Sequence, residues 1–191
     1  MVNKNDQDDS MRFVLIGLRW DASQYSKDFF FDIDISAFML DEIDKLMNPS
    51  DFIFYNNIKD SKDAIVHSGD NRNGCNDGCN NDIETIVIDF SKIPDEIKKI
   101  AICVSIHDSE IRHSNFGQVS DAYVRIVQLA YENDKKGIPI LLFDLSNEFS
   151  AESALVVAEF HRSNGNWDCK AVSRGVDGGL EGICRLFGAD I

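Results

Sequence analysis

Residues 64–90 read Ala-Ile-Val-His-Ser-Gly-Asp-Asn-Arg-Asn-Gly-Cys-Asn-Asp-Gly-Cys-Asn-Asn-Asp-Ile-Glu-Thr-Ile-Val-Ile-Asp-Phe. A short apolar run, Ala64 to Val66, enters this stretch, and an alternating run, Thr85 to Phe90, leaves it. Residues 67–84 hold three glycines, five asparagines and four carboxylates, a composition that favours turns and cannot build a core. The stretch therefore predicts two strands joined by a long acidic loop, and with them a β fold.

The loop is rich in the oxygen ligands that Ca²⁺ takes six to eight at a time. With Asn73 as the first position of a twelve-residue calcium loop, Asp77 falls at position 5, Gly78 at the sharp turn and Glu84 at the terminal bidentate position. The match is incomplete, because Cys75 stands where an oxygen is needed and the flanks read as strands instead of helices. A calcium loop and a solvated Asn/Asp/Gly turn both remain open from the loop alone.

The chain carries 33 acidic and 19 basic residues, a formal net charge of −14 over 191 residues. This charge repels nucleic acids and anionic membrane surfaces and makes cations the natural partners. Apolar residues make up 43%, so we expect one folded domain over residues 11–191 behind a disordered polar leader at residues 1–10. We see no membrane span and, with five cysteines, no disulfide framework, and we expect a cytoplasmic location.

Short apolar runs separated by turn residues extend along the chain and predict an all-β protein, a β-sandwich with short helical turns and a C-terminal helix. The further strands are expected at residues 11–20, 29–40, 51–55, 100–106, 122–129, 138–145, 154–161 and 167–172. Pro94 to Lys99 predicts one helical turn with proline near its start. Leu180 to Phe187 predicts the C-terminal helix, entered through Gly178-Gly179 and stopped by Gly188.

Asp32 and Asp34 lie two residues apart in an expected strand, so both carboxylates leave the same face. Two like charges side by side cost free energy unless a cation neutralises them. The pair is a second indication of a metal, although a solvated outer face of a strand explains it equally well.

Short blocks of sequence follow one another in the order known from one family. They are Gly17-Leu-Arg-Trp-Asp21, Asp32-Ile-Asp34-Ile-Ser-Ala-Phe38, Asp51-Phe-Ile-Phe-Tyr-Asn56, His67-Ser-Gly-Asp-Asn71, Asp82-Ile-Glu84, Asn115-Phe-Gly-Gln-Val119, Asp144-Leu145, Glu159-Phe-His-Arg162, Asn164-Gly165 with Trp167, and Gly178-Gly-Leu180. In these blocks the chain resembles the TerD family of tellurium-resistance and stress proteins, over about residues 11–191.

The resemblance implies a calcium-binding β-sandwich without established catalysis that acts in stress response and tellurium resistance, with possible protein partners in a stress-response complex. It also implies that the acidic loop and the Asp-x-Asp strand supply the ligands. Carried over position by position, the ligand set is Asp32, Asp34, Asp70, Asp77, Asp82 and Glu84, with Asn71 and Gly74 as carbonyl donors. Residues 79–81 look like an insertion and Ile83 replaces an acid, departures that should weaken calcium binding.

Three other interpretations compete with a plain calcium-binding protein. Calcium could order the loop so that it presents a surface to a protein partner, which makes the chain a calcium-regulated interaction module. Cys75 and Cys79, with His67 close in sequence, could bind a soft metal such as zinc. His67, His107 and His113 could serve a metal-dependent hydrolase, with a metal-activated water and a histidine as general base. The sequence shows no metal-ligand spacing of histidines and no nucleophile motif, so we expect no enzyme.

Overall fold

The computed structural model describes residues 11–21, 31–71, 81–134, 136–145 and 151–189, and these form a sandwich of two five-stranded sheets. The strands are β1 (Phe13–Arg19), β2 (Ile33–Leu40), β3 (Phe52–Ile53), β4 (Ile65–His67), β5 (Glu84–Asp89), β6 (Lys99–Ile106), β7 (Tyr123–Leu129), β8 (Ile138–Asp144), β9 (Ala154–Ser163) and β10 (Asn166–Val176). The expected β-sandwich is thereby confirmed.

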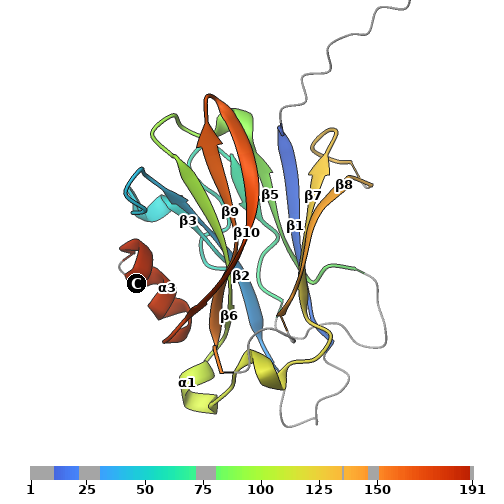
Figure 1. The fold of residues 1–191 in the computed structure, drawn as a ribbon, viewed down its shortest axis with the longest axis vertical. Coiled ribbons are helices and arrows are strands. Elements are labelled where there is room, and N and C mark those ends of the chain that lie inside the picture. Colours follow the sequence, from blue (N-terminus) through green and yellow to red (C-terminus); the bar gives the residue numbers. More distant parts are fainter. Residues whose placement is uncertain (1–10, 22–30, 72–80, 135, 146–150, 190–191) are drawn as a thin grey trace, which may run out of the picture.

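Every neighbouring pair of strands is antiparallel. One sheet has the order β4-β5-β1-β7-β8 and the other the order β10-β9-β6-β2-β3. β4 pairs with β5 from Ile65↔Ile88 to His67↔Ile86, so the predicted hairpin is confirmed. Figure 1 shows the two sheets facing each other, with the β9–β10 hairpin at the top and α1 (Ser109–Arg112) at the bottom.

The core lies between the sheets, where alternate residues of each strand meet. Ile16 from β1 and Ile35 from β2 are both fully buried there. β2 is buried along its whole length because its other face is also covered, in part by the C-terminal helix. Phe38 of β2 packs against Phe187 of that helix, with ring centroids 5.0 Å apart.

The C-terminal helix, α3 (Gly179–Phe187), confirms the sequence prediction. Its caps, Gly178 and Gly188, both have positive φ angles, of 86° and 77°, which glycine adopts without steric cost. The remaining helical turns are short: η1 (Pro49–Asp51), η2 (Phe90–Lys92) and η3 (Phe116–Gln118). Within the described parts of the chain, no helix has the length and apolar character needed to cross a membrane.

Two local predictions differ from the structure. The helical turn expected at Pro94 to Lys99 is instead a turn at residues 94–97, closed by the Ile97 N–H donating to the Pro94 carbonyl at 3.1 Å, and Lys99 already belongs to β6. The strand expected at residues 51–55 is reduced to the two residues of β3, which pairs with β2 only at Ala37 and Phe38. The first half of β2 therefore lies beyond the reach of β3, and this shapes the site described next.

Candidate metal centre

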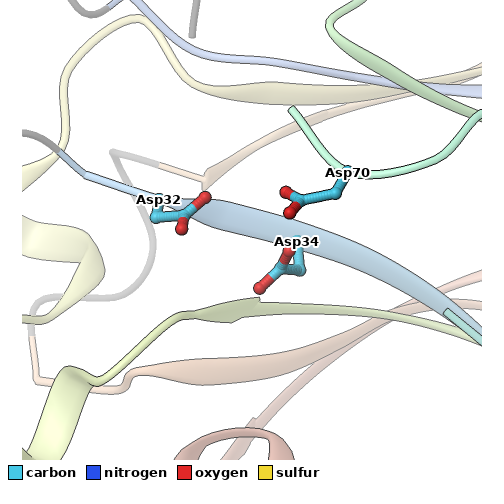
Figure 2. Close-up of side chains that lie close together, drawn as sticks. All are labelled: Asp32, Asp34 and Asp70. Atoms are coloured by element: carbon cyan, nitrogen blue, oxygen red, sulfur yellow. The ribbon is translucent and has the colours of Figure 1, made fainter. Parts of the chain in front are cut away.

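Three carboxylates meet at the start of β2. Asp32 directly precedes the strand and Asp34 is its second residue, while Asp70 lies in the segment that follows β4 in the other sheet. One oxygen atom of each residue lies within 4.8 Å of the other two. Figure 2 shows the three side chains together, with the carboxylate of Asp70 pointing toward β2. The structure thus joins the Asp-x-Asp strand to the first acid of the loop.

Two buried side chains take the place of a neighbouring strand beside Ile35 of β2. The Ile35 N–H donates to Glu84 Oε2 at 3.1 Å, and His67 Nε2 lies 3.1 Å from the Ile35 carbonyl oxygen. Both side chains come from the β4–β5 hairpin of the opposite sheet. The β4–β5 hairpin is therefore hydrogen-bonded to the part of β2 that carries Asp34.

The hydrogen bonds of His67 fix its tautomer. The Gly69 N–H donates to His67 Nδ1 at 2.9 Å, so this nitrogen is the acceptor and the ring proton sits on Nε2. The Nε2–H then donates to the Ile35 carbonyl oxygen, with Glu84 Oε2 at 3.6 Å. Both ring nitrogens of the buried imidazole are thereby used for structure, and neither is available as a general base.

Glu84 connects the two segments that carry the carboxylates. Its Oε2 accepts from Ile35, the residue after Asp34, and its Oε1 accepts the N–H of Asn71, the residue after Asp70, at 3.1 Å. The side chain is completely buried, at 0% exposure. One rigid carboxylate therefore sets the distance between Asp34 and Asp70 through the backbone on either side.

The electrostatics of the three carboxylates favour a bound cation. Asp32 and Asp34 are only 7% and 4% exposed, so their charges repel one another with little screening by water. His107 Nδ1 lies 3.9 Å from Asp34 Oδ2 and adds a positive charge only when protonated. Ca²⁺ binds oxygen at about 2.3–2.6 Å, so two oxygens across one ion lie up to about 5 Å apart, and the three carboxylates fit this span.

Asp82, another residue of the expected ligand set, has a different partner. Its two oxygens accept from Arg125 Nε and Nη2 of β7 at 2.7 and 2.6 Å, a bidentate pair. This hydrogen bonding to Asp82 raises the pKa of Arg125 above its usual value. The pair lies over Gly17 of β1, where the carboxylate of Asp82 occupies the space that a Cβ atom would fill.

The other expected residues are only partly described. Gly74 and Asp77, like Cys75 and Cys79 of the soft-metal hypothesis, lie outside the described residues. Asn71 is half-buried and its N–H is bonded to Glu84. Among the described residues, the group of acids that could hold a metal ion consists of Asp32, Asp34 and Asp70, without a histidine or a cysteine.

Sequence reasoning missed the structural role of His67 and the partner of Asp82. The buried position of His67 could have been predicted from the sequence. Ile65 and His67 are two residues apart in β4, so their side chains leave the same, inward face of the strand. No local signal identifies Arg125, which is 43 residues away from Asp82. The pairing of Asp82 with Arg125 follows from the sheet register, since Gly17 of β1 stands opposite both Arg125 of β7 and Thr85 of β5.

Comparison with known proteins identifies the family of the chain. The sequence-family model of the TerD domain matches residues 2–187 of this chain. The chain belongs to the TerD domain family. Tellurium resistance protein TerD from Serratia marcescens is 42% identical over 180 residues, which cover 94% of this chain and 88% of that protein. General stress protein 16U from Bacillus subtilis (strain 168) is 40% identical over 178 residues, covering 93% and 88%.

The fold is also shared with a solved TerD homologue. The crystal structure of a homologue of telluride resistance protein (TerD) from Streptomyces coelicolor A3(2) superimposes with a TM-score of 0.72. The match covers 94% of this chain and 96% of that one, at 21% sequence identity. The resemblance inferred from the sequence blocks is thereby confirmed at the level of family and fold.

Proposed function

We propose that this TerD family member binds Ca²⁺ as a non-catalytic protein of the stress and tellurium-resistance response. The observation that carries the proposal is the group of three carboxylates, in which two buried acids and one exposed acid present an oxygen each within 4.8 Å. All three donors are hard oxygen ligands, which suit Ca²⁺ and not a thiophilic metal. The names of the two relatives, a tellurium resistance protein and a general stress protein, support the cellular role.

In the proposed site, Asp32, Asp34 and Asp70 are the first ligands, and Glu84 holds their segments together. Asp77, Gly74 and Asn71 remain predicted ligands from the resemblance, whereas Asp82, also predicted, has both oxygens paired with Arg125. Ca²⁺ takes six to eight oxygens, so three monodentate carboxylates leave room for further donors from the loop and from water. Binding instead of turnover is favoured because the buried imidazole of His67 spends both nitrogens on structural bonds.

The exposed position of Asp70 also supports the calcium-regulated interaction module as a second function. Asp70 is the exposed member of the group and belongs to the segment that leads into the loop, whereas Asp32 and Asp34 are fixed in the sandwich. An ion shared by these acids would attach the entrance of the loop to β2, and a partner could recognise that state. The location proposed for this interaction is the cytoplasm.

Calorimetric titration of the metal-stripped protein with Ca²⁺ tests the proposal, with Mg²⁺ and Zn²⁺ as controls. We expect saturable Ca²⁺ binding that Asp70→Asn weakens at least about tenfold, because the variant removes one of three ligand charges. Asp70 is exposed, so the fold should survive its replacement. Glu42→Gln removes the same charge at an exposed position in the loop after β2 and should leave the affinity unchanged. Equal affinity for Ca²⁺ in both variants would exclude the site.

A further inference from the structure

A second site lies at the other end of the sandwich. A cavity of about 590 Å³ opens there, where β1 and β6 begin and the β9–β10 hairpin turns. β6 runs from Lys99 at this end to Ile106, which pairs with Ile33 at the carboxylate end. Eight strand residues span about 25 Å, so the cavity and the metal centre are separate. In Figure 1 the cavity end is at the top, at the β9–β10 hairpin and the start of β1.

The lining of this cavity has the opposite charge to the rest of the protein. Three cations, Arg12, Lys98 and Arg162, line it together with one acid, Asp95, for a formal charge of +2. The whole chain carries −14. A cavity with a positive lining on a strongly negative molecule selects for small anions, because large polyanions such as nucleic acid are repelled by the surrounding surface.

Arg162 is held in place at the wall of the cavity. Its Nη1 donates to Asp95 Oδ1 at 2.8 Å and its Nη2 to the Ile93 carbonyl at 2.9 Å. The guanidinium lies over the ring of Trp167, 4.8 Å from the centroid. The side chain is only 12% exposed, and its buried Nε has no hydrogen-bond partner among the described residues. The guanidinium is therefore a positive charge held in a fixed position at the wall of the cavity.

The other two cations remain adjustable. Arg12 is 62% exposed and lies 3.6 Å from Asp89 through its Nε, a long and solvent-screened contact. Lys98 is exposed, and its Nζ donates to the Asp95 carbonyl oxygen at 2.6 Å, which leaves further donors on the ammonium group. One fixed guanidinium and two flexible cations can therefore converge on an oxyanion from several sides.

The remaining lining suits the body of a small organic molecule. Phe90 and Trp167 form an apolar floor, and Ser91 and Asn166 are exposed polar side chains at the rim. The volume falls in the range of small-molecule sites. The sequence blocks Glu159-Phe-His-Arg162 and Asn164-Gly165 with Trp167, which contribute nothing to the metal centre, supply part of this lining.

We propose that this cavity binds a small molecule through a phosphate group, which Arg12, Lys98 and Arg162 recognise. Arg162 provides a fixed positive charge, with one N–H on each Nη atom beyond its bonds to Asp95 and Ile93, and the aromatic floor accepts the apolar part of the ligand. The site acts independently of the metal centre and requires no calcium.

The two tryptophans of the chain allow a direct test, because each reports on one end of the sandwich. Trp167 lies in the cavity lining, whereas the indole N–H of Trp20 donates to the Phe31 carbonyl, next to Asp32, at 3.1 Å. The ¹⁵N-labelled full chain, in low-salt buffer without calcium, is titrated with inorganic phosphate, adenosine monophosphate and adenosine. The indole signal of Trp167 should shift saturably with an oxyanion ligand, while that of Trp20 stays in place.

The three probes separate the sources of the oxyanion. A shift of the Trp167 signal with inorganic phosphate would mean that the free anion is sufficient for binding. A shift with adenosine monophosphate but not with inorganic phosphate would mean that the site requires an organic phosphate. A shift with adenosine as strong as with its monophosphate would overturn the proposal, because adenosine carries no oxyanion. The absence of any Trp167 shift with all three probes would overturn it as well.

Charge-removing variants complete the test. Arg12→Gln and Lys98→Gln replace exposed residues and should each raise the dissociation constant at least about fivefold. Lys62→Gln removes the same charge from an exposed position outside the cavity and should leave the constant unchanged. An unaltered Trp20 signal confirms that each variant is folded. Equal binding by all three variants would show that the cavity does not hold the anion.

Discussion

Glu84 is a buried carboxylate that uses both oxygens to hold backbone. Because it accepts from Ile35 and Asn71, we expect Glu84→Gln to weaken the site without removing a member of the three-carboxylate group. Glutamine keeps one acceptor oxygen and turns an NH₂ group toward the other N–H, which leaves a buried donor unsatisfied. The free energy of unfolding in urea should fall by about 1–3 kcal/mol, and calcium affinity by about tenfold.

The matched control for this prediction is Glu42→Gln, which removes one carboxylate from an exposed loop position. It should change neither the urea midpoint nor the affinity. Full calcium affinity in a folded Glu84→Gln protein would mean that Glu84 does not set the spacing of Asp34 and Asp70.

At the scale of single residues, sequence reasoning identified the acids but could not assign their roles. Asp70, Asp82 and Glu84 all fit a calcium loop by residue type and spacing. Their contacts separate them, since Asp70 joins β2, Asp82 binds Arg125 and Glu84 accepts backbone N–H groups. These contacts depend on the register of strands far apart in sequence, which no local pattern encodes.

At the scale of elements, periodicity and residue type predicted most of the strands. The nearly continuous apolar run of β6 correctly indicated a central strand, and the β-branched residues of β7 correctly favoured a strand over a helix. In place of the helical turn expected from Pro94, the structure has a β-turn in which Pro94 is the first residue and its carbonyl accepts the Ile97 N–H. Tertiary contacts decide there: Ile97 is buried, and the Lys98 N–H donates to the Leu40 carbonyl at 2.8 Å.

The packing of α3 on the second sheet gives a prediction for pH. Burial raises the pKa of Cys184, on the buried face of α3, from 9.0 to about 11. The unfolded chain therefore loses this proton first as the pH rises, and stability falls between about pH 9 and pH 11. By linkage, ionisation of this thiol lowers the free energy of unfolding by an amount on the order of 1–2 kcal/mol at about pH 10.5.

Cys184→Ala isolates this contribution, because other ionising groups stay the same in both proteins. Urea unfolding at pH 8 and pH 10.5 should show a smaller alkaline loss for the variant than for the parent chain. A variant that loses as much stability as the parent would mean that the thiol ionises equally in the folded and unfolded states.

At the scale of the whole molecule, the sandwich places an acidic site and a cationic cavity at opposite ends of one core. The acidic composition led us to expect cations as partners but did not predict this division, because a net charge of −14 says nothing about where three cationic side chains gather. The division follows from topology. β2 begins where β6 ends, so the Asp-x-Asp pair and the chain segments before β1 and β6 lie at different ends of the strands.

The last prediction separates specific calcium binding from screening of the overall negative charge. Calcium at about 100 times its dissociation constant should stabilise the fold by about 2.7 kcal/mol, which corresponds to a rise of about 5–11 °C in the melting temperature. The acids of the centre lie within 4.8 Å of one another. Salt at about 0.1 M screens charges beyond about 10 Å, so it should leave most of the calcium-dependent gain in place.

Melting curves in calcium or chelator, at about 0.01 M and 0.1 M salt, measure both effects. Asp70→Asn should lose most of the calcium-dependent gain and Glu42→Gln should retain it, although both variants lower the negative charge by one. If salt alone reproduced the gain, or if both variants kept it equally, calcium would be acting as a counterion of the whole surface. A gain that survives salt and disappears only with Asp70 requires an ion held between the start of β2 and the β4–β5 hairpin.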